Sequence, residues 1–150
     1  ARGQIASVGD AGERAERIKT ALDAYRGALC EGTDYPWADE VREYYRHKAV
    51  DAAVLLAQHT AAGNNPREAV ALLERATTWE PANETICRRL IGLHRELGQH
   101  EAAQHAYERL ARHLADLDVT PAAATRCLAF PPSTQVRARA GEASAVRGVR

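Results

Sequence analysis

Apolar residues recur at intervals of three and four along most of this chain, which is the spacing of one face of an α-helix. Prolines that suit a first helical turn, and residues that suit helix caps, stand at the ends of these periodic stretches. The pattern predicts helices over residues 12–26, 37–62, 66–79, 83–97, 99–117 and 121–128. We therefore expect an all-α protein.

Part of this pattern repeats after 34 residues. Three apolar positions of the 66–79 helix recur in the 99–117 helix, as Ala69, Leu73 and Ala76 followed by Ala103, Tyr107 and Leu110. A 34-residue period is typical of tetratricopeptide hairpins, and small residues such as Ala69 and Ala103 let two helices approach closely. We predict a tetratricopeptide-like array of right-handed helical hairpins, an α–α superhelix. The alternative is an ordinary helical bundle in which the spacing is a coincidence.

A glycine precedes each repeated set, at Gly63 and at Gly98. Glycine enters the left-handed backbone region freely, so we expect both glycines to reverse the chain. They lie 35 residues apart, because 98 − 63 = 35, whereas the residues after them repeat after 34. The first turn is therefore expected to be one residue longer than the second.

Length and composition predict a single domain. The chain has 150 residues, 45% of them apolar, and its 20 basic residues balance its 20 acidic ones. Residues 1–12 contain three glycines and are interpreted as a linker, 13–131 as the helical domain, and 132–150 as a flexible basic tail. The tail holds four arginines against one glutamate, which leaves the rest slightly acidic and a poor match for DNA.

Candidate chemistry is sparse. The sequence contains no glycine-rich phosphate loop, GxSxG or HExxH motif, and its six histidines show no spacing that would bring four zinc ligands together. Cys30, Cys87 and Cys127 are too widely spaced for a metal pair and are interpreted as reduced packing thiols in the cytoplasm. His59 and His94 occupy similar places in the two units and are interpreted as packing residues. We predict no catalytic, cofactor or metal residue.

Two sets of residues are candidates for partner binding. If the first helix of each hairpin lines a concave face, Arg46, Arg88 and Arg95 share that face as a basic strip, which would bind an acidic peptide. Val50 and Ala53 would lie on the same face. The alternative is a solvated surface in which the arginines pair with nearby glutamates.

Aromatic residues form the second set. Trp37, Tyr44 and Tyr45 are expected to cluster under the loop that precedes the 37–62 helix. The alternative is self-association through these rings, since aromatic residues are enriched at interfaces.

A resemblance to a known family rests on residues spread over about 13–130. They are Tyr25-Arg26-Gly27, Gly32, Trp37, Arg42, Glu80-Pro81, Glu84, Leu90, Gly98-Gln99, Ala103, Tyr107-Glu108-Arg109-Leu110, Leu114, Val119 and Pro121. In these residues the chain resembles the bacterial transcriptional activation domain (BTAD) of actinobacterial regulators of the Streptomyces antibiotic regulatory protein type. The resemblance implies a tetratricopeptide-like domain that contributes to dimerisation and activation, usually after a winged-helix DNA-binding domain.

The chain departs from that family in two respects. Asp118 replaces the glycine that usually precedes the Val-x-Pro exit, and twelve residues before position 13 are too few for a winged helix. DNA binding by this chain itself is therefore not expected.

The predicted function is a non-enzymatic protein–protein interaction or dimerisation domain of a cytoplasmic bacterial transcriptional regulator, with a protein partner or a second copy. The alternative is an adaptor or sensor module of a larger envelope or signalling protein, which would bind a peptide or small ligand on its concave face.

Overall fold

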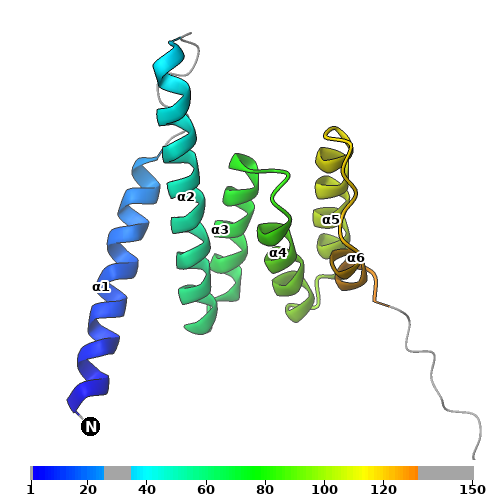
Figure 1. Ribbon diagram of the computed structural model, residues 1–150. Helices are drawn as coiled ribbons and strands as arrows, with labels where there is room; N and C mark the ends of the chain where they lie inside the picture. The colour runs from blue at the N-terminus through cyan, green and yellow to red at the C-terminus, as the bar shows by residue number, and fades with distance from the viewer. Residues whose placement is uncertain (1, 26–34, 132–150) are drawn as a thin grey trace, which may run out of the picture.

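The computed structural model describes residues 2–25 and 35–131, and for residues 2–9 and Pro36 it describes the backbone only. Over this part of the chain there are six α-helices and no strand (Figure 1). The helices are α1 (Arg2–Ala24), α2 (Pro36–Ala62), α3 (Pro66–Trp79), α4 (Glu84–Glu96), α5 (His100–Ala115) and α6 (Ala123–Ala129). Except for the start of α1, every boundary lies within two residues of its predicted position.

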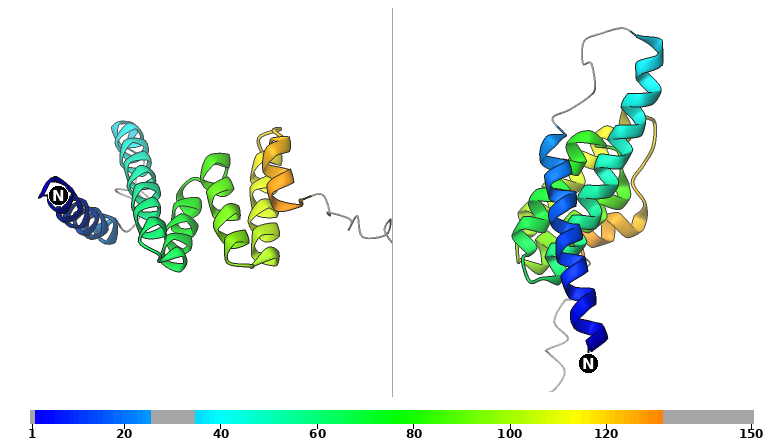
Figure 2. Two further views of the ribbon diagram at one scale, coloured as in Figure 1. Left: turned by 90° about the horizontal axis from the view of Figure 1, so that it is seen from below. Right: turned by 90° about the vertical axis from the view of Figure 1, so that its left-hand side faces the viewer.

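The helices follow one another as antiparallel neighbours. α1 packs on α2, α2 on α3, α3 on α4 and α4 on α5, while the short α6 packs against both α4 and α5 (Figures 1 and 2). Each helix therefore contacts mainly its neighbours in sequence, as in a stacked hairpin array. The predicted all-helical, tetratricopeptide-like array is confirmed.

The core runs along the interior of this array. Leu73, Leu90, Ile91 and Leu110 are among its largest fully buried side chains. Burying a side chain of this size stabilises a fold by about 1.5–3 kcal/mol. Small residues stand where the hairpin helices cross, and Ala69, Ala76 and Ala103 are 0% exposed. The repeated small positions are therefore core positions, as the sequence predicts.

The chain reversals differ from the prediction in one respect. Gly63 has an ordinary φ of −78°, and the left-handed residue of that turn is Asn64, with φ 63°. Gly98 is left-handed as expected, with φ 72°. The hydrogen bonds explain the placement: the N–H of Asn65 bonds Thr60 O and the N–H of Gln99 bonds His94 O, which is the Schellman pattern at a helix C-terminus.

This correction makes the 34-residue period consistent. The two left-handed residues, Asn64 and Gly98, lie 34 apart because 98 − 64 = 34, and both turns contain three residues, 63–65 and 97–99. The expected extra residue in the first turn is therefore wrong. In the corrected register His94 corresponds to Thr60 rather than to His59.

α5 ends with the same motif. The N–H of Val119 bonds Leu114 O at 2.9 Å, and Asp118 is the left-handed residue, with φ 57°. An aspartate tolerates this conformation better than most residues but less well than glycine. Asp118 thus has a backbone conformation that favours glycine, and glycine is the residue that the family resemblance predicts at this position.

The N-terminal segment is the largest difference from the predicted boundaries. Helix α1 begins at Arg2, inside the segment 1–12 that the sequence analysis assigns to a linker. Each glycine within a helix costs only about 1 kcal/mol relative to alanine, so scattered glycines weaken a helix without ending it. The C-terminus of α1 is held by Arg75, whose guanidinium donates to the carbonyls of Leu22 and Tyr25. The predicted tail, 132–150, lies outside the described residues.

Helix α6 is tied to α4 by polar contacts. One carboxylate oxygen of Glu84 accepts from the Ala122 N–H at 2.9 Å and from the hydroxyl of Thr125, which is 0% exposed. Farther along, Arg95 donates to Leu128 O at 2.7 Å. A helix of seven residues is marginal alone, so these contacts position α6.

Candidate interaction site

Aromatic side chains project from the N-terminal half of α2. Trp37 is 60% exposed, Tyr44 58% and Tyr45 51%. Together with Val41 and Lys48 they form what we call the aromatic face. Four of its residues, at positions 37, 41, 44 and 48, follow helical spacings of four, three and four, so they lie on one side of α2.

The rings of the aromatic face form pairs rather than one buried cluster. Tyr44 and Tyr45 meet edge to face at 5.5 Å between centroids, and Lys48 Nζ lies 5.5 Å from the centroid of Tyr44. Trp37 stacks on Tyr35 at 5.8 Å. The loop under which these rings were expected to pack lies outside the described residues. Each of the three residues is more than half exposed, and packing under that loop stays a prediction.

The aromatic face lies on a side of α2 that is exposed farther along as well, where Leu55 is 46% exposed, and in a part of α2 that α3 does not reach. α2 has 27 residues whereas its hairpin partner α3 has 14, so α3 covers only the C-terminal half of α2. The N-terminal half extends past the neighbouring helices (Figures 1 and 2). Most buried residues of α2, such as Ala53 and Leu56, lie toward its C-terminal half, although Ala38 near the N-terminus is also 0% exposed.

The three predicted partner-binding arginines have different surroundings. Arg46 bonds Glu43 Oε1 at 2.5 Å and Arg95 holds the α6 carbonyl, whereas Arg88 is exposed. By the 34-residue register Arg46 corresponds to position 80, because 46 + 34 = 80, which precedes the start of α4. The structure therefore does not place Arg46 level with the two arginines of α4. Nor do Val50 and Ala53 line an open face, because they are 5% and 0% exposed.

A charged cluster beside Arg46 was not found from the sequence. His47 Nε2 lies 3.2 Å from Glu80 Oε1 and 3.9 Å from Glu43 Oε1, and Asn83 donates to the other oxygen of Glu80 at 2.8 Å. The contact between His47 and Glu80 joins α2 to the α3–α4 turn. The His47–Glu80 contact joins residues 33 positions apart, because 80 − 47 = 33, so no local spacing could have indicated it.

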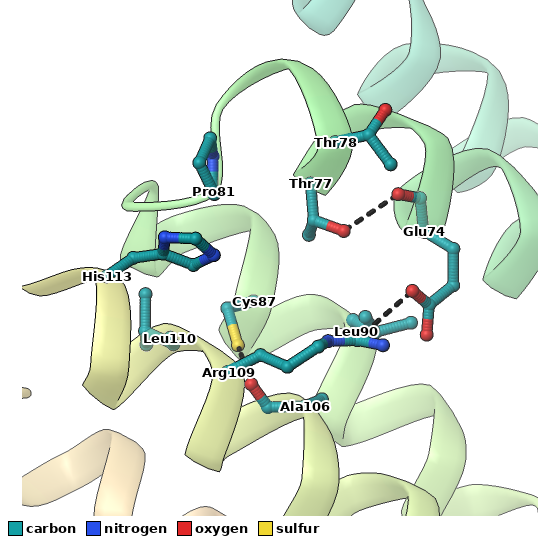
Figure 3. Close-up of a pocket in the computed structure, with 10 residues that line it drawn as sticks. All are labelled: Glu74, Thr77, Thr78, Pro81, Cys87, Leu90, Ala106, Arg109, Leu110 and His113. Atoms are coloured by element: carbon teal, nitrogen blue, oxygen red, sulfur yellow. Dashed lines mark hydrogen bonds and ion pairs between the residues drawn. The ribbon is translucent and has the colours of Figure 1, made fainter.

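A groove of about 280 Å³ lies between α3 and α5 (Figure 3). Glu74 and Arg109 form an ion pair across it at 2.8 Å. The thiol of Cys87 lines the groove and donates to Ala106 O at 3.3 Å. Burial raises the pKa of Cys87 from 9.0 to about 11, against the opposing effect of the Arg109 charge. Cys87 is therefore a protonated, buried thiol, as predicted, and is poorly suited to act as a nucleophile.

The other cysteines and the histidines give a mixed outcome. Cys127 is exposed, contrary to its expected packing role, and Cys30 lies outside the described residues. His94 is buried, with Nδ1 2.8 Å from Gln99 Oε1 and Nε2 3.6 Å from a Glu74 oxygen. His59 is exposed and lines a groove between α1 and α2. Among the described residues no group of three or more His, Cys, Asp or Glu side chains could hold a metal ion.

A further groove lies between α2 and α4. Its walls are small and apolar, from Val54, Ala57 and Gly92 among others, with Arg89 at the rim. An added side-chain atom at Gly92 would meet no other atom within 4 Å. This groove is open between two first helices of successive hairpins, so it is a second candidate contact surface.

Comparisons with known proteins identify the family. The family model of the bacterial transcriptional activator domain matches residues 1–129. The chain belongs to this family. Comparisons with curated proteins and with solved structures returned no match. None of the helices in the described residues is long and apolar enough to span a membrane.

The bacterial transcriptional activator domain family is a family of regulatory domains. Most residues that carry the resemblance serve the fold in this structure. Glu84 holds α6, Gly98 reverses the chain, Ala103 lies at a helix crossing and Tyr107 meets Phe130 edge to face at 5.4 Å. Trp37 differs, because its side chain is 60% exposed.

Proposed function

We propose that this chain is a non-enzymatic interaction domain of a cytoplasmic actinobacterial transcriptional regulator. In this proposal it acts by self-association or by contact with the transcription machinery. Its membership of a family of transcriptional activator domains gives the general role. The observation that carries the interaction role is the aromatic face of α2, on which three large rings are more than half exposed.

Exposed aromatic rings on one helix side favour a partner for energetic reasons. Aromatic side chains bury 150–250 Å² each and dominate many interfaces, whereas a scattered apolar residue on a surface carries no such meaning. On this chain Trp37, Tyr44 and Tyr45 are gathered on 9 consecutive positions of one helix. A partner that covers them would remove a continuous apolar surface from water.

A tethering assay tests the proposal. The chain is fused to an unrelated DNA-binding domain that is already dimeric, and in parallel to one that binds its operator only after dimerisation. Reporter transcription and operator occupancy measure contact with the transcription machinery and self-association, respectively. We expect at least one response, and we expect Trp37→Ala to reduce it.

Leu117→Ala is the matched control, because Leu117 is 61% exposed and lies beyond α5, away from α2. Equal responses from the wild-type chain, Trp37→Ala and Leu117→Ala, or no response in either fusion, would contradict the proposal.

A second candidate function is supported by the groove between α2 and α4. An adaptor or sensor in a larger envelope or signalling protein would hold a peptide or small ligand there. A ligand present at 100 times its Kd stabilises the folded chain by about 2.7 kcal/mol, which a thermal-shift screen detects. Gly92→Leu, which fills the open space, should abolish that shift. No stabilising ligand in a broad screen would count against this function.

The predicted basic strip can be tested with one clean variant. Arg88→Glu reverses an exposed charge, whereas Arg95→Glu would also remove the contact with α6. If an acidic peptide binds this face, Arg88→Glu should weaken its binding, and unchanged binding would exclude a role for Arg88.

A further inference from the structure

The aromatic face occupies the part of α2 that the hairpin partner leaves uncovered. Three residues separate α2 from α3, which has 14 residues, so α3 reaches back to about position 49, because 62 − 13 = 49. The stretch of α2 that α3 leaves free is thus 37–48, and Figure 1 shows α2 extending beyond the end of α3. On this free stretch the aromatic face is exposed, whereas Ala38 on another side of the helix is 0% exposed.

The spacing of the aromatic face suits a partner helix rather than an extended strand or a flat surface. Trp37, Val41, Tyr44 and Lys48 alternate steps of four and three residues, which is the a/d spacing of a helix pair. Between positions 37 and 48 this seam spans about 16 Å of helix. Helices that pair along such a seam place their side chains between those of the partner.

Steric limits select one arrangement for two copies of this chain. A parallel pair would set the two helical arrays side by side and would bring each Lys48 against the Lys48 of the partner. An antiparallel pair keeps the arrays at opposite ends, provided that the overlap stops at residue 48. Full use of the free stretch then places residue 37 opposite residue 48 of the partner, so that residue i faces residue 85 − i.

This register is self-complementary. Val41 meets the partner's Tyr44 near the two-fold axis, and symmetry repeats that apolar contact. Trp37 meets the partner's Lys48, which permits a cation–π contact at each end of the seam.

We propose that the aromatic face of α2 binds the same face of α2 in a second copy, antiparallel, in this register. The inference rests on the self-association part of the proposed function and adds the interface and its geometry. A second copy is favoured over an unrelated helix because the seam complements itself in the antiparallel orientation. Lys48 of one copy then faces a tryptophan ring, and Val41 faces a tyrosine ring.

Cysteine cross-linking between two chains tests the register. The exposed Cys127 and also Cys30 are replaced by serine, and the buried Cys87 is kept. A tagged Val41→Cys chain is mixed with an untagged Tyr44→Cys chain and oxidised mildly. We expect the mixed disulfide dimer to form in clear excess over either homodimer, because a disulfide needs Cβ atoms about 3.5–4.5 Å apart.

Sedimentation equilibrium supplies the second readout. Tyr44→Glu places a charge near the two-fold axis and should weaken self-association at least about tenfold, whereas Leu117→Glu, at an exposed site away from α2, should leave it unchanged. Circular dichroism checks that both variants are folded.

Each outcome decides one question. Self-association with preferential 41–41 cross-links, or with no effect of Tyr44→Glu, overturns this interface and leaves the proposed function intact. A wild-type chain that remains monomeric at high concentration also overturns the interface. In that case the fusion to the DNA-binding domain that is already dimeric tests the proposed function. Reporter activation by this fusion does not require self-association of the chain.

Discussion

Alanine at position 92 should stabilise this protein, whereas alanine at position 98 should destabilise it. Both glycines belong to the same hairpin: Gly92 lies inside α4, and Gly98 is the left-handed residue that ends it, with φ 72°. At both positions an added Cβ atom would meet nothing within 4 Å. Steric contacts with neighbours are therefore absent at both sites, and only the backbone conformation distinguishes them.

The magnitudes follow from that conformation. Inside a helix, alanine is favoured over glycine by about 0.5–1 kcal/mol, chiefly because glycine loses more backbone entropy on folding. In the left-handed region a residue with a Cβ costs about 1–2 kcal/mol, which exceeds the 0.4–1 kcal/mol that alanine saves in the unfolded chain. We expect Gly92→Ala to gain about 0.7 kcal/mol and Gly98→Ala to lose about 1 kcal/mol.

Urea unfolding followed by far-ultraviolet circular dichroism measures both changes. The two midpoints should move in opposite directions at equal m-values, so the difference between the variants is about 1.7 kcal/mol. The double variant should lie near the sum, provided that the two sites do not interact.

Gly98→Ala at or above wild-type stability would refute the left-handed assignment and, with it, the Schellman motif at the end of α4. A destabilised Gly92→Ala would show that the space beside Gly92 is filled, which would remove the groove between α2 and α4 as a candidate contact surface.

Three other predictions concern single side chains. Cys127 should react with a thiol reagent in the native protein, whereas Cys87 should not. The pKa of the Cys87 thiol is near 9 in the unfolded chain and about 11 in the folded protein, so between these pH values the unfolded state binds fewer protons. The free energy of unfolding should therefore fall as the pH rises from 9 to 11. That fall should be smaller in Cys87→Ala, and an identical slope would contradict the pKa assignment. Glu84→Ala should cost about 1–3 kcal/mol and expose the amides of α6 to hydrogen exchange, because it leaves the buried Thr125 hydroxyl without its acceptor, whereas Glu84→Gln keeps an oxygen and should lose less. Asp118→Gly should raise the free energy of unfolding by up to about 1 kcal/mol, and an unchanged or lower urea midpoint would contradict strain at that residue.

The helices could be predicted from the sequence because their signals are local. The three-and-four spacing of apolar residues, the prolines at 36 and 66 and the cap at Asn83 fix helix ends within two residues. Asn83 accepts from the Ile86 N–H at 3.2 Å, as a cap residue should. The small core positions also follow from the repeat, since Ala69 and Ala103 are both fully buried.

The candidate contact surface could not be predicted in the same way. Trp37, Tyr44 and Tyr45 have a spacing that core residues also show, and only the tertiary structure reveals that this side of α2 meets water. Likewise Arg95 and Arg46 have equivalent sequence signals, but one holds α6 and the other pairs within α2.

The amino-acid sequence alone therefore determined the helices, their period and the small residues at their crossings, because each depends on residues a few positions apart. The tertiary structure decided which turn residue is left-handed, which aromatic rings meet water and which arginines are engaged. Those properties depend on how separate helices and turns pack against one another, and local spacing does not encode that.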